Sequence, residues 1–94
     1  NHTLGFPGMN QLSCVVFLAD TLEPGRGDTP ELEHLRQLAQ KNLYQAVWLT
    51  SDYTIKQLLG LHILIHPRIL LTRNWFMEKA KKELHEHKSK QTIN

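Results

Sequence analysis

The sequence has very little cysteine and none of the short motifs that mark common catalytic or metal sites. Cys14 is the one cysteine among 94 residues, which excludes an internal disulfide and a four-thiolate zinc site. A glycine-rich phosphate loop, a CxxC pair and a Ser/His/Asp arrangement are also missing. The scarcity of cysteine fits a reducing compartment, and we expect a cytoplasmic location.

Long apolar runs suited to a membrane are lacking as well. The apolar stretch over residues 58–67 contains His62 and His66 and ends at Pro67, so it is too short and too polar to cross a bilayer. No basic start followed by an apolar run and a small-residue cleavage site is visible, and residue 1 is asparagine. We therefore expect no membrane partner, and a sequence that was trimmed or is a piece of a longer one.

The composition is that of one small globular domain. Apolar residues make up 40% and charged residues 21% of the chain, which excludes a disordered or fibrous protein. A chain of this size buries only about 60 to 65% of the surface that it exposes when unfolded. Its core is therefore modest, and a partner surface would add to its stability.

Charge is distributed unevenly along the chain. Residues 1–60 carry a formal charge of −2, whereas residues 61–94 carry +4. Most of the positive charge lies after Glu78, in a mixture of lysine, glutamate and histidine that is typical of a solvated helix end. No aromatic residue interleaves these lysines, so we do not expect nucleic-acid binding. RNA contact through this tail is a weaker alternative, which a steep salt dependence would reveal.

Apolar spacing predicts an all-α protein of about four helices. Apolar residues recur three and four positions apart, while the alternation typical of strands does not recur. We expect helices at about residues 10–22, from an N-cap at Thr29 or Asp28 with Pro30 at the first helical position, at 42–59, and from Pro67 to about residue 84. Residues 1–84 would form the domain, and residues 85–94 a basic polar tail that frays.

The first predicted helix raises the question of a buried carboxylate. Residues 14–19 are apolar all round, as in a helix that is enclosed on most sides, and Asp20 follows directly. Asp20 then lies either at an exposed helix end or in a desolvated position. In the second case it requires a metal or another cation, because an unpaired buried charge is strongly destabilising.

Two further segments have side chains suited to anions. Arg26 lies between Gly25 and Gly27, where the backbone can approach a phosphate that the guanidinium group would hold. The alternative is a surface turn whose arginine is solvated or paired with a neighbouring carboxylate. His66 and Arg68 flank Pro67 at a helix start, where free N–H groups attract anions. Spacing alone does not show that these segments converge with Asp20.

Several of these motifs together resemble one known family. Four segments carry the resemblance: Phe17-Leu18-Ala19-Asp20, Glu23-Pro24-Gly25-Arg26, Ile65-His66-Pro67-Arg68 and Arg73-Asn74-Trp75. In this order they resemble the C-terminal half of the YqeK-type HD-domain phosphohydrolases, the bacterial symmetrical bis(5'-nucleosyl)-tetraphosphatases. The opening His2-Thr3, followed by Gly5 and Gly8, is similar to a loop of that family. The resemblance covers roughly residues 1–77.

The resemblance implies a helical HD-domain fold and a metal-dependent hydrolase. Family members bind a metal, commonly iron, through a His, a His-Asp pair and a later Asp, which Asp20 matches as catalytic and metal-binding residue. By the same matching, His2, Asp20 and Arg26 would contact the nucleotide or its phosphates. The nucleotide site would be lined by Leu64, Ile65, His66, Pro67 and Arg68. The implied reaction cleaves diadenosine tetraphosphate to two molecules of ADP, with a metal-activated water as attacking group.

One departure from the family pattern sets the remaining expectations. The upstream His and the His-Asp doublet are not present in these 94 residues, so we expect the chain alone to be inactive. Apolar surface between Cys14 and Leu18 would be left uncovered, favouring a homodimer or association with the missing N-terminal half. The alternative is a non-catalytic helical module that binds a nucleotide or a protein partner.

Overall fold

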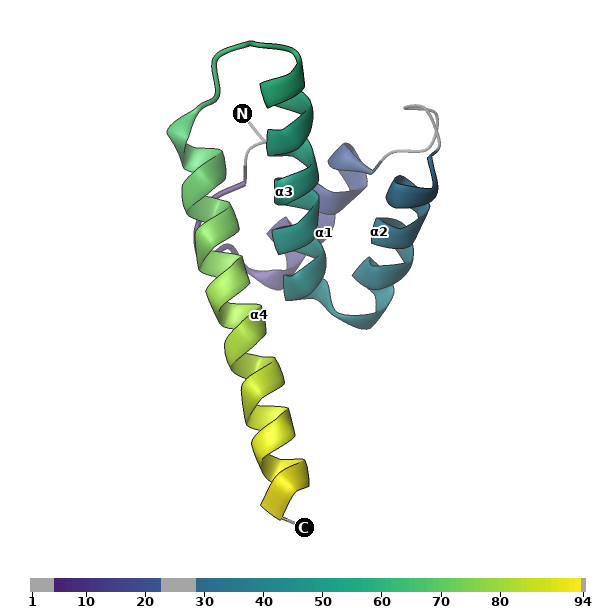
Figure 1. Ribbon diagram of the computed structural model, residues 1–94, viewed down its shortest axis with the longest axis vertical. Helices are drawn as coiled ribbons and strands as arrows, with labels where there is room; N and C mark the ends of the chain where they lie inside the picture. Colours follow the sequence, from purple (N-terminus) through teal and green to yellow (C-terminus); the bar gives the residue numbers. More distant parts are fainter. Residues whose placement is uncertain (1–4, 23–28, 94) are drawn as a thin grey trace.

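The computed structural model describes residues 5–22 and 29–93, with side chains as far as residue 85. It contains four helices, α1 (Gln11–Thr21), α2 (Pro30–Lys41), α3 (Leu43–Gly60) and α4 (Pro67–Ile93). No strand occurs within these described ranges. The prediction of an all-α fold with four helices is confirmed (Figure 1).

Side-chain caps explain where the first three helices begin. Asn10 Oδ1 accepts a hydrogen bond from the Ser13 N–H at 2.8 Å, and Thr29 Oγ1 accepts one from Leu32 at 3.2 Å. Asn42 ends α2 by donating its N–H to the Leu38 carbonyl, and its side chain opens α3. These side chains accept hydrogen bonds from first-turn N–H groups that have no partner within the helix. Because such capping residues are recognisable by type, the helix starts could be predicted from the sequence.

Helix α3 is the central element of the packing. The helices α1, α2 and α4 all pack against it, and Figure 1 shows α4 lying alongside α3 and extending beyond the other helices. Val47 on α3, Phe17 on α1 and Phe76 on α4 are at most 2% exposed. The core therefore forms where α1, α2 and α4 meet the N-terminal half of α3, with Leu32 and Leu35 as the buried residues of α2.

Small polar residues and one ion pair join α3 to α4. Thr50 and Ser51 on α3 and Thr72 on α4 are fully buried, and the Thr72 hydroxyl donates to the Arg68 carbonyl at 2.9 Å. Arg73 Nε donates to Asp52 Oδ1 at 2.7 Å across the two helices. The small side chains let the helices approach, and the partly exposed ion pair adds one polar contact between them.

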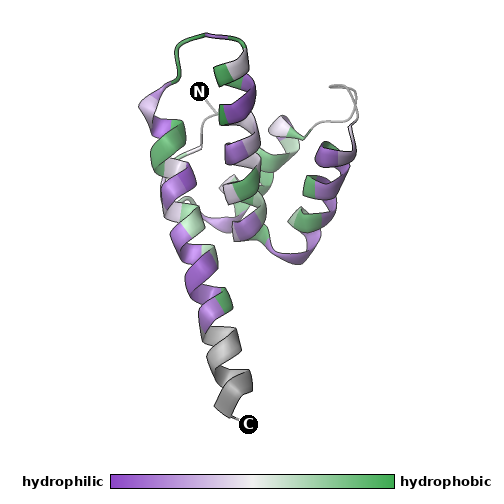
Figure 2. Ribbon diagram, viewed as in Figure 1, coloured by the Kyte–Doolittle hydropathy of each residue, from purple (hydrophilic) through white to green (hydrophobic). Residues whose placement is uncertain are grey.

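The helix α1 is covered on one face only. Cys14, Phe17 and Leu18 are buried, whereas Val15 is 52% and Val16 is 45% exposed. The expectation of uncovered apolar surface between Cys14 and Leu18 is therefore correct for the two valines and wrong for the other three residues, which pack into the core. Figure 2 shows the hydrophobic character of α1 and of the α3–α4 connection.

Among residues 5–22 and 29–93, no helix combines the length and the apolar character that crossing a bilayer requires. The helix α4 continues to Ile93. The fraying of residues 85–94 stays a prediction.

Candidate functional site

A hollow brings the N-terminal loop, α1 and the start of α4 together. Its volume is about 380 Å³, and it is lined by Gly5, Phe6, Met9, Leu12, Ser13, Val16 and Arg68. Most of these side chains are apolar, and Arg68 contributes the positive charge. Two segments that the sequence placed about fifty residues apart, α1 and the His66–Arg68 helix start, thus share one site.

The loop at the edge of the hollow depends on two glycines with positive φ. Gly5 has φ +66° and Gly8 has φ +74°, a region that other residues rarely adopt. A Cβ on Gly5 would lie 3.2 Å from Met9 Cε and 3.3 Å from Phe17 Cδ1. The loop is therefore held against the core, with Met9 only 3% exposed.

Arg68 is positioned by the cap of α4. The Arg68 N–H donates to His66 Nδ1 at 3.0 Å, and the Ile69 N–H donates to the His66 carbonyl at 3.2 Å. Since Nδ1 accepts, the ring proton of His66 lies on Nε2 in this arrangement. His66 thus acts first as the capping residue of α4, and Pro67 follows in the first turn. Arg68 itself is half-buried.

The other residues of this segment do not line the hollow. Leu64 is 100% exposed, His66 and Pro67 are exposed, and Ile65 is half-buried. Their assignment to a nucleotide site stays a prediction. His62 adopts φ +58° in the connection between α3 and α4, so His62 and His66 do not form a helical i, i+4 pair.

Asp20 lies half-buried near the end of α1. It is four residues after Val16, which lines the hollow, so Asp20 continues the same face of the helix by one turn. Within the described part of the chain, no hydrogen bond or ion pair involves its carboxylate. The assignment of Asp20 as a metal and catalytic residue stays a prediction. His2 and Arg26 lie outside the described residues.

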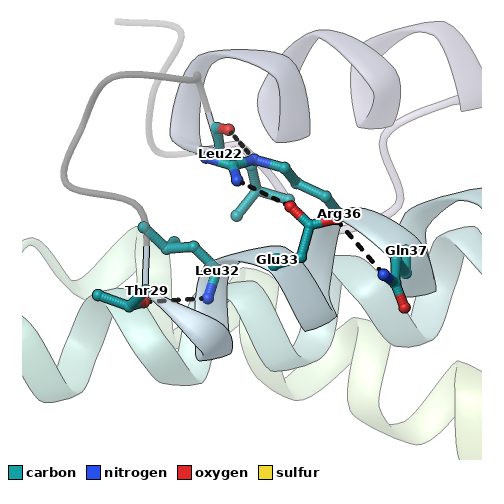
Figure 3. A network of polar contacts seen from close by, with 6 residues as sticks. All are labelled: Leu22, Thr29, Leu32, Glu33, Arg36 and Gln37. Carbon is teal, nitrogen blue, oxygen red and sulfur yellow. Dashed lines mark hydrogen bonds and ion pairs between the residues drawn. The ribbon is translucent and has the colours of Figure 1, made fainter.

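An arginine that the sequence analysis did not single out stabilises the end of α1. Arg36 Nε on α2 donates to the Leu22 carbonyl at 2.9 Å, and its Nη1 lies 3.2 Å from Glu33 Oε1 (Figure 3). The guanidinium group places positive charge at the negative end of the α1 dipole. Little in the sequence indicates this role of Arg36, because the i, i+3 spacing of Glu33 and Arg36 reveals only the local ion pair and not the contact with Leu22.

Comparisons with known proteins agree on one group of relatives. The chain is 36% identical over 76 residues to the "Bis(5'-nucleosyl)-tetraphosphatase, symmetrical" of Bacillus subtilis, covering 81% of the chain and 40% of that protein. The protein of the same name from Halalkalibacterium halodurans is 36% identical over 80 residues, covering 85% of the chain and 42% of the relative. No family model matches the sequence.

A solved structure supports the same relationship. A crystal structure from Clostridium acetobutylicum, described as a predicted HD superfamily hydrolase involved in NAD metabolism, matches with a TM-score of 0.74 and 31% identity. The match covers 83% of the chain and 41% of that protein. The chain is homologous to part of these HD-superfamily hydrolases. It spans about two fifths of their length.

The homology allows a test of whether the described residues suit a metal. The matched structure is described as an HD superfamily hydrolase, and hydrolases of that superfamily depend on a metal in general; a first shell requires several carboxylate or imidazole ligands. Among residues 5–22 and 29–85, no three His, Cys, Asp or Glu side chains are grouped closely enough to hold an ion. The described residues thus include Asp20 as a candidate single ligand and do not by themselves form a complete metal centre.

Proposed function

We propose that this chain forms the nucleotide-binding side of a metal-dependent HD-type phosphohydrolase. The substrate would be a dinucleoside tetraphosphate, cleaved symmetrically to two nucleoside diphosphates in the cytoplasm. The main support for this proposal is that the N-terminal loop, α1 and Arg68 line one hollow. The chain is also 36% identical to symmetrical tetraphosphatases over the matched residues.

The hollow has the chemistry that a nucleotide requires. The planar guanidinium group of Arg68 can donate two parallel hydrogen bonds to phosphate oxygens. Phe6, Leu12 and Val16 provide an apolar wall against which a base or ribose could pack. By resemblance, His2, Arg26 and residues 64–67 complete the contacts with the nucleotide.

Asp20 would bind the metal at the far end of the same face of α1. The remaining ligands would come from residues outside the described ones, and the resemblance implies iron. When bound, such a metal supplies Lewis-acid stabilisation and an activated water. The role of this chain is to hold the phosphates with Arg68 and to orient the nucleotide against the apolar wall.

A second candidate is a nucleotide-binding module without catalytic activity. It is favoured by one observation, since the side chains of residues 5–22 and 29–85 include no group of three metal ligands. Such a module would retain the hollow and Arg68 but would not turn over substrate.

A chimera can test hydrolysis. In it, this chain replaces the matched region of the Bacillus subtilis relative, so that the remaining part of that protein supplies the other ligands. With divalent iron, we expect diadenosine tetraphosphate to yield ADP, measured by ion-exchange chromatography. Asp20→Asn should lower turnover by more than the roughly 10 to 100-fold typical of outer-shell changes.

The control is Glu78→Gln, which removes an exposed carboxylate from α4 and should leave turnover unchanged. Undiminished activity of Asp20→Asn would remove Asp20 from the metal site. A folded chimera without activity would leave the second candidate as the function.

Nucleotide binding by the 94-residue chain itself can be measured by calorimetry. Arg68→Ala should weaken the binding of diadenosine tetraphosphate about tenfold or more, the loss expected for one charge-assisted contact. Lys79→Ala removes an exposed cation from the same helix outside the hollow and is the matched control. Equal losses in the two variants would show only general attraction between charges.

A further inference from the structure

The helix α4 carries an open hollow that the proposed function does not use. Figure 1 shows this helix extending beyond the others. The hollow has a volume of about 730 Å³ and shares no lining residue with the hollow that contains Arg68. It is lined by Trp75, Glu78, Lys79, Lys81, Lys82 and His85. We call these six residues the basic surface of α4.

Lysine side chains give the basic surface of α4 its charge. Three lysines and one glutamate leave a formal charge of +2 when His85 is neutral. Within residues 5–22 and 29–85, none of these lysines makes an ion pair, so Glu78 does not neutralise them directly. All three lysines are exposed. A group of exposed cations attracts a polyanion, and the attraction weakens as the salt concentration rises.

Trp75 adds a partly exposed aromatic ring to this surface. The residue is 38% exposed. The centroid of its ring lies 4.7 Å from that of Phe76 and 6.5 Å from that of Tyr44, both in T-shaped geometry. A Cβ on the loop residue Gly8 would lie 3.7 Å from the same ring. These neighbours fix the orientation of the ring and leave part of it open to a planar ligand.

The tertiary structure thus combines two features that are apart in the sequence. The expectation of no nucleic-acid binding depends on the absence of aromatic residues among the lysines. On the helix surface, Lys79 and Lys82 follow Trp75 at i+4 and i+7 and lie on the same face. The ammonium group of Lys81 lies 5.7 Å from the centroid of the Trp48 ring. Both tryptophans of the chain therefore have lysines beside them.

We infer that the basic surface of α4 binds single-stranded nucleic acid. One base stacks on the Trp75 ring, and the lysines that follow along the helix hold the phosphates. Lys82 lies about 10.5 Å from Trp75 along the helix axis, a distance that about three stacked nucleotides span at about 3.4 Å each. An aromatic platform beside a row of cations is typical of proteins that bind single strands without reading their sequence.

The chemistry of this surface favours a single strand over a duplex or an acidic polypeptide. In a duplex the bases stack on one another, so none offers its face to Trp75. An acidic polypeptide pairs with the lysines but provides no planar partner for the ring. The inference is independent of the proposed function, because the basic surface of α4 and the hollow that contains Arg68 have no residue in common.

The test measures binding by the 94-residue chain. Fluorescence anisotropy follows a labelled single-stranded uridine oligonucleotide of about 12 nucleotides. The chain should bind it, and the logarithm of the affinity should fall linearly with the logarithm of the salt concentration. Trp75→Leu keeps an apolar side chain without a ring and should weaken binding at least about fivefold, with the salt slope unchanged. Trp75→Phe keeps a ring and should retain most of the affinity.

Lys82→Gln tests the charges without altering the core. This variant should weaken binding and reduce the salt slope by about 0.7, the value for one phosphate contact with a single strand. Lys56→Gln is the matched control, because Lys56 is an exposed lysine on α3 outside the basic surface. It should change neither the affinity nor the slope. Circular dichroism establishes that all variants are folded. Equal effects of Lys82→Gln and Lys56→Gln would overturn the inference.

Three further ligands distinguish the alternatives. A deoxythymidine oligonucleotide of the same length should bind alike, since neither stacking nor the phosphate contacts use the 2′-hydroxyl group. Excess diadenosine tetraphosphate should leave the strand bound, and complete displacement would place the strand in the hollow that contains Arg68. A glutamate peptide of the same length should not compete, and displacement by it would assign the surface to an acidic polypeptide. Either displacement, or the absence of binding by both oligonucleotides, would contradict the inference.

Discussion

Replacing single glycines by alanine tests the loop that shapes the hollow. Gly5 has a positive φ, and an added Cβ would crowd Met9 and Phe17 at 3.2 and 3.3 Å. Gly8 also has a positive φ, but its Cβ would meet the Trp75 ring at an ordinary 3.7 Å. Gly60 ends α3, and nothing lies within 4 Å of its Cβ position.

The three substitutions should therefore change the free energy of unfolding by different amounts, and one of them in the opposite direction. A left-handed conformation destabilises the folded protein by about 1 to 2 kcal/mol when the residue is alanine. Alanine also lowers the conformational entropy of the unfolded chain, and this offsets about 0.4 to 1 kcal/mol of that loss. Crowding of two buried side chains adds about 1 to 3 kcal/mol at Gly5. We expect Gly5→Ala to lower the free energy of unfolding by about 2 to 4 kcal/mol and Gly8→Ala to lower it by about 1 kcal/mol. Gly60→Ala should raise the free energy of unfolding by up to about 1 kcal/mol, because alanine favours the helix more than glycine does.

Urea unfolding followed by circular dichroism gives these free energies of unfolding. For a chain of this size, 1 kcal/mol corresponds to about 4 to 8 °C in melting temperature, so the order is measurable. Equal losses at Gly5 and Gly8 would show that Met9 and Phe17 do not crowd the added Cβ. A Gly5→Ala protein as stable as the parent would refute the described loop conformation.

Two further predictions concern α3, α4 and α1. The ion pair between Arg73 and Asp52 is partly exposed, with side chains 28% and 39% accessible. A double-mutant cycle with Arg73→Gln and Asp52→Asn should therefore give a coupling energy of about 0.2 to 1 kcal/mol that declines in high salt. Zero coupling at low salt would contradict the ion pair. Burial raises the pKa of the Cys14 thiol from 9.0 to about 11. The unfolded thiol therefore ionises first, so stability should be full below pH 9 and should fall between pH 9 and 11 more steeply than in Cys14→Ala. Parallel pH profiles of the two proteins in urea titrations would count against this burial.

The elements that could be predicted from the sequence depend on neighbours in the chain. The side chains of Thr29 and Asn42 cap helices within three residues of themselves, and Pro67 marks the start of α4. The apolar character of residues 14–19 is likewise visible locally. These are interactions over one or two helical turns, so the sequence displays both partners together.

The candidate site was only partly predictable, because it depends on contacts between distant segments. Asp20 and Arg68 were identified by residue type and by the family resemblance, but it was not visible that Arg68 lines a hollow with α1, one helical turn from Asp20. Arg36 was missed, since its partner, the Leu22 carbonyl, lies on another helix. The roles of His2, Arg26 and residues 64–67 stay predictions.

By itself, the sequence determined the helices, their starts and the family to which the motifs point, since periodicity and capping are local properties. Only the tertiary structure decided which faces of α1 are buried and which border the hollow. It also decided that Arg68, the N-terminal loop and α1 line one hollow. Those outcomes depend on how α1, α2 and α4 pack around α3, and packing is settled by the shapes of many side chains that are distant in the chain.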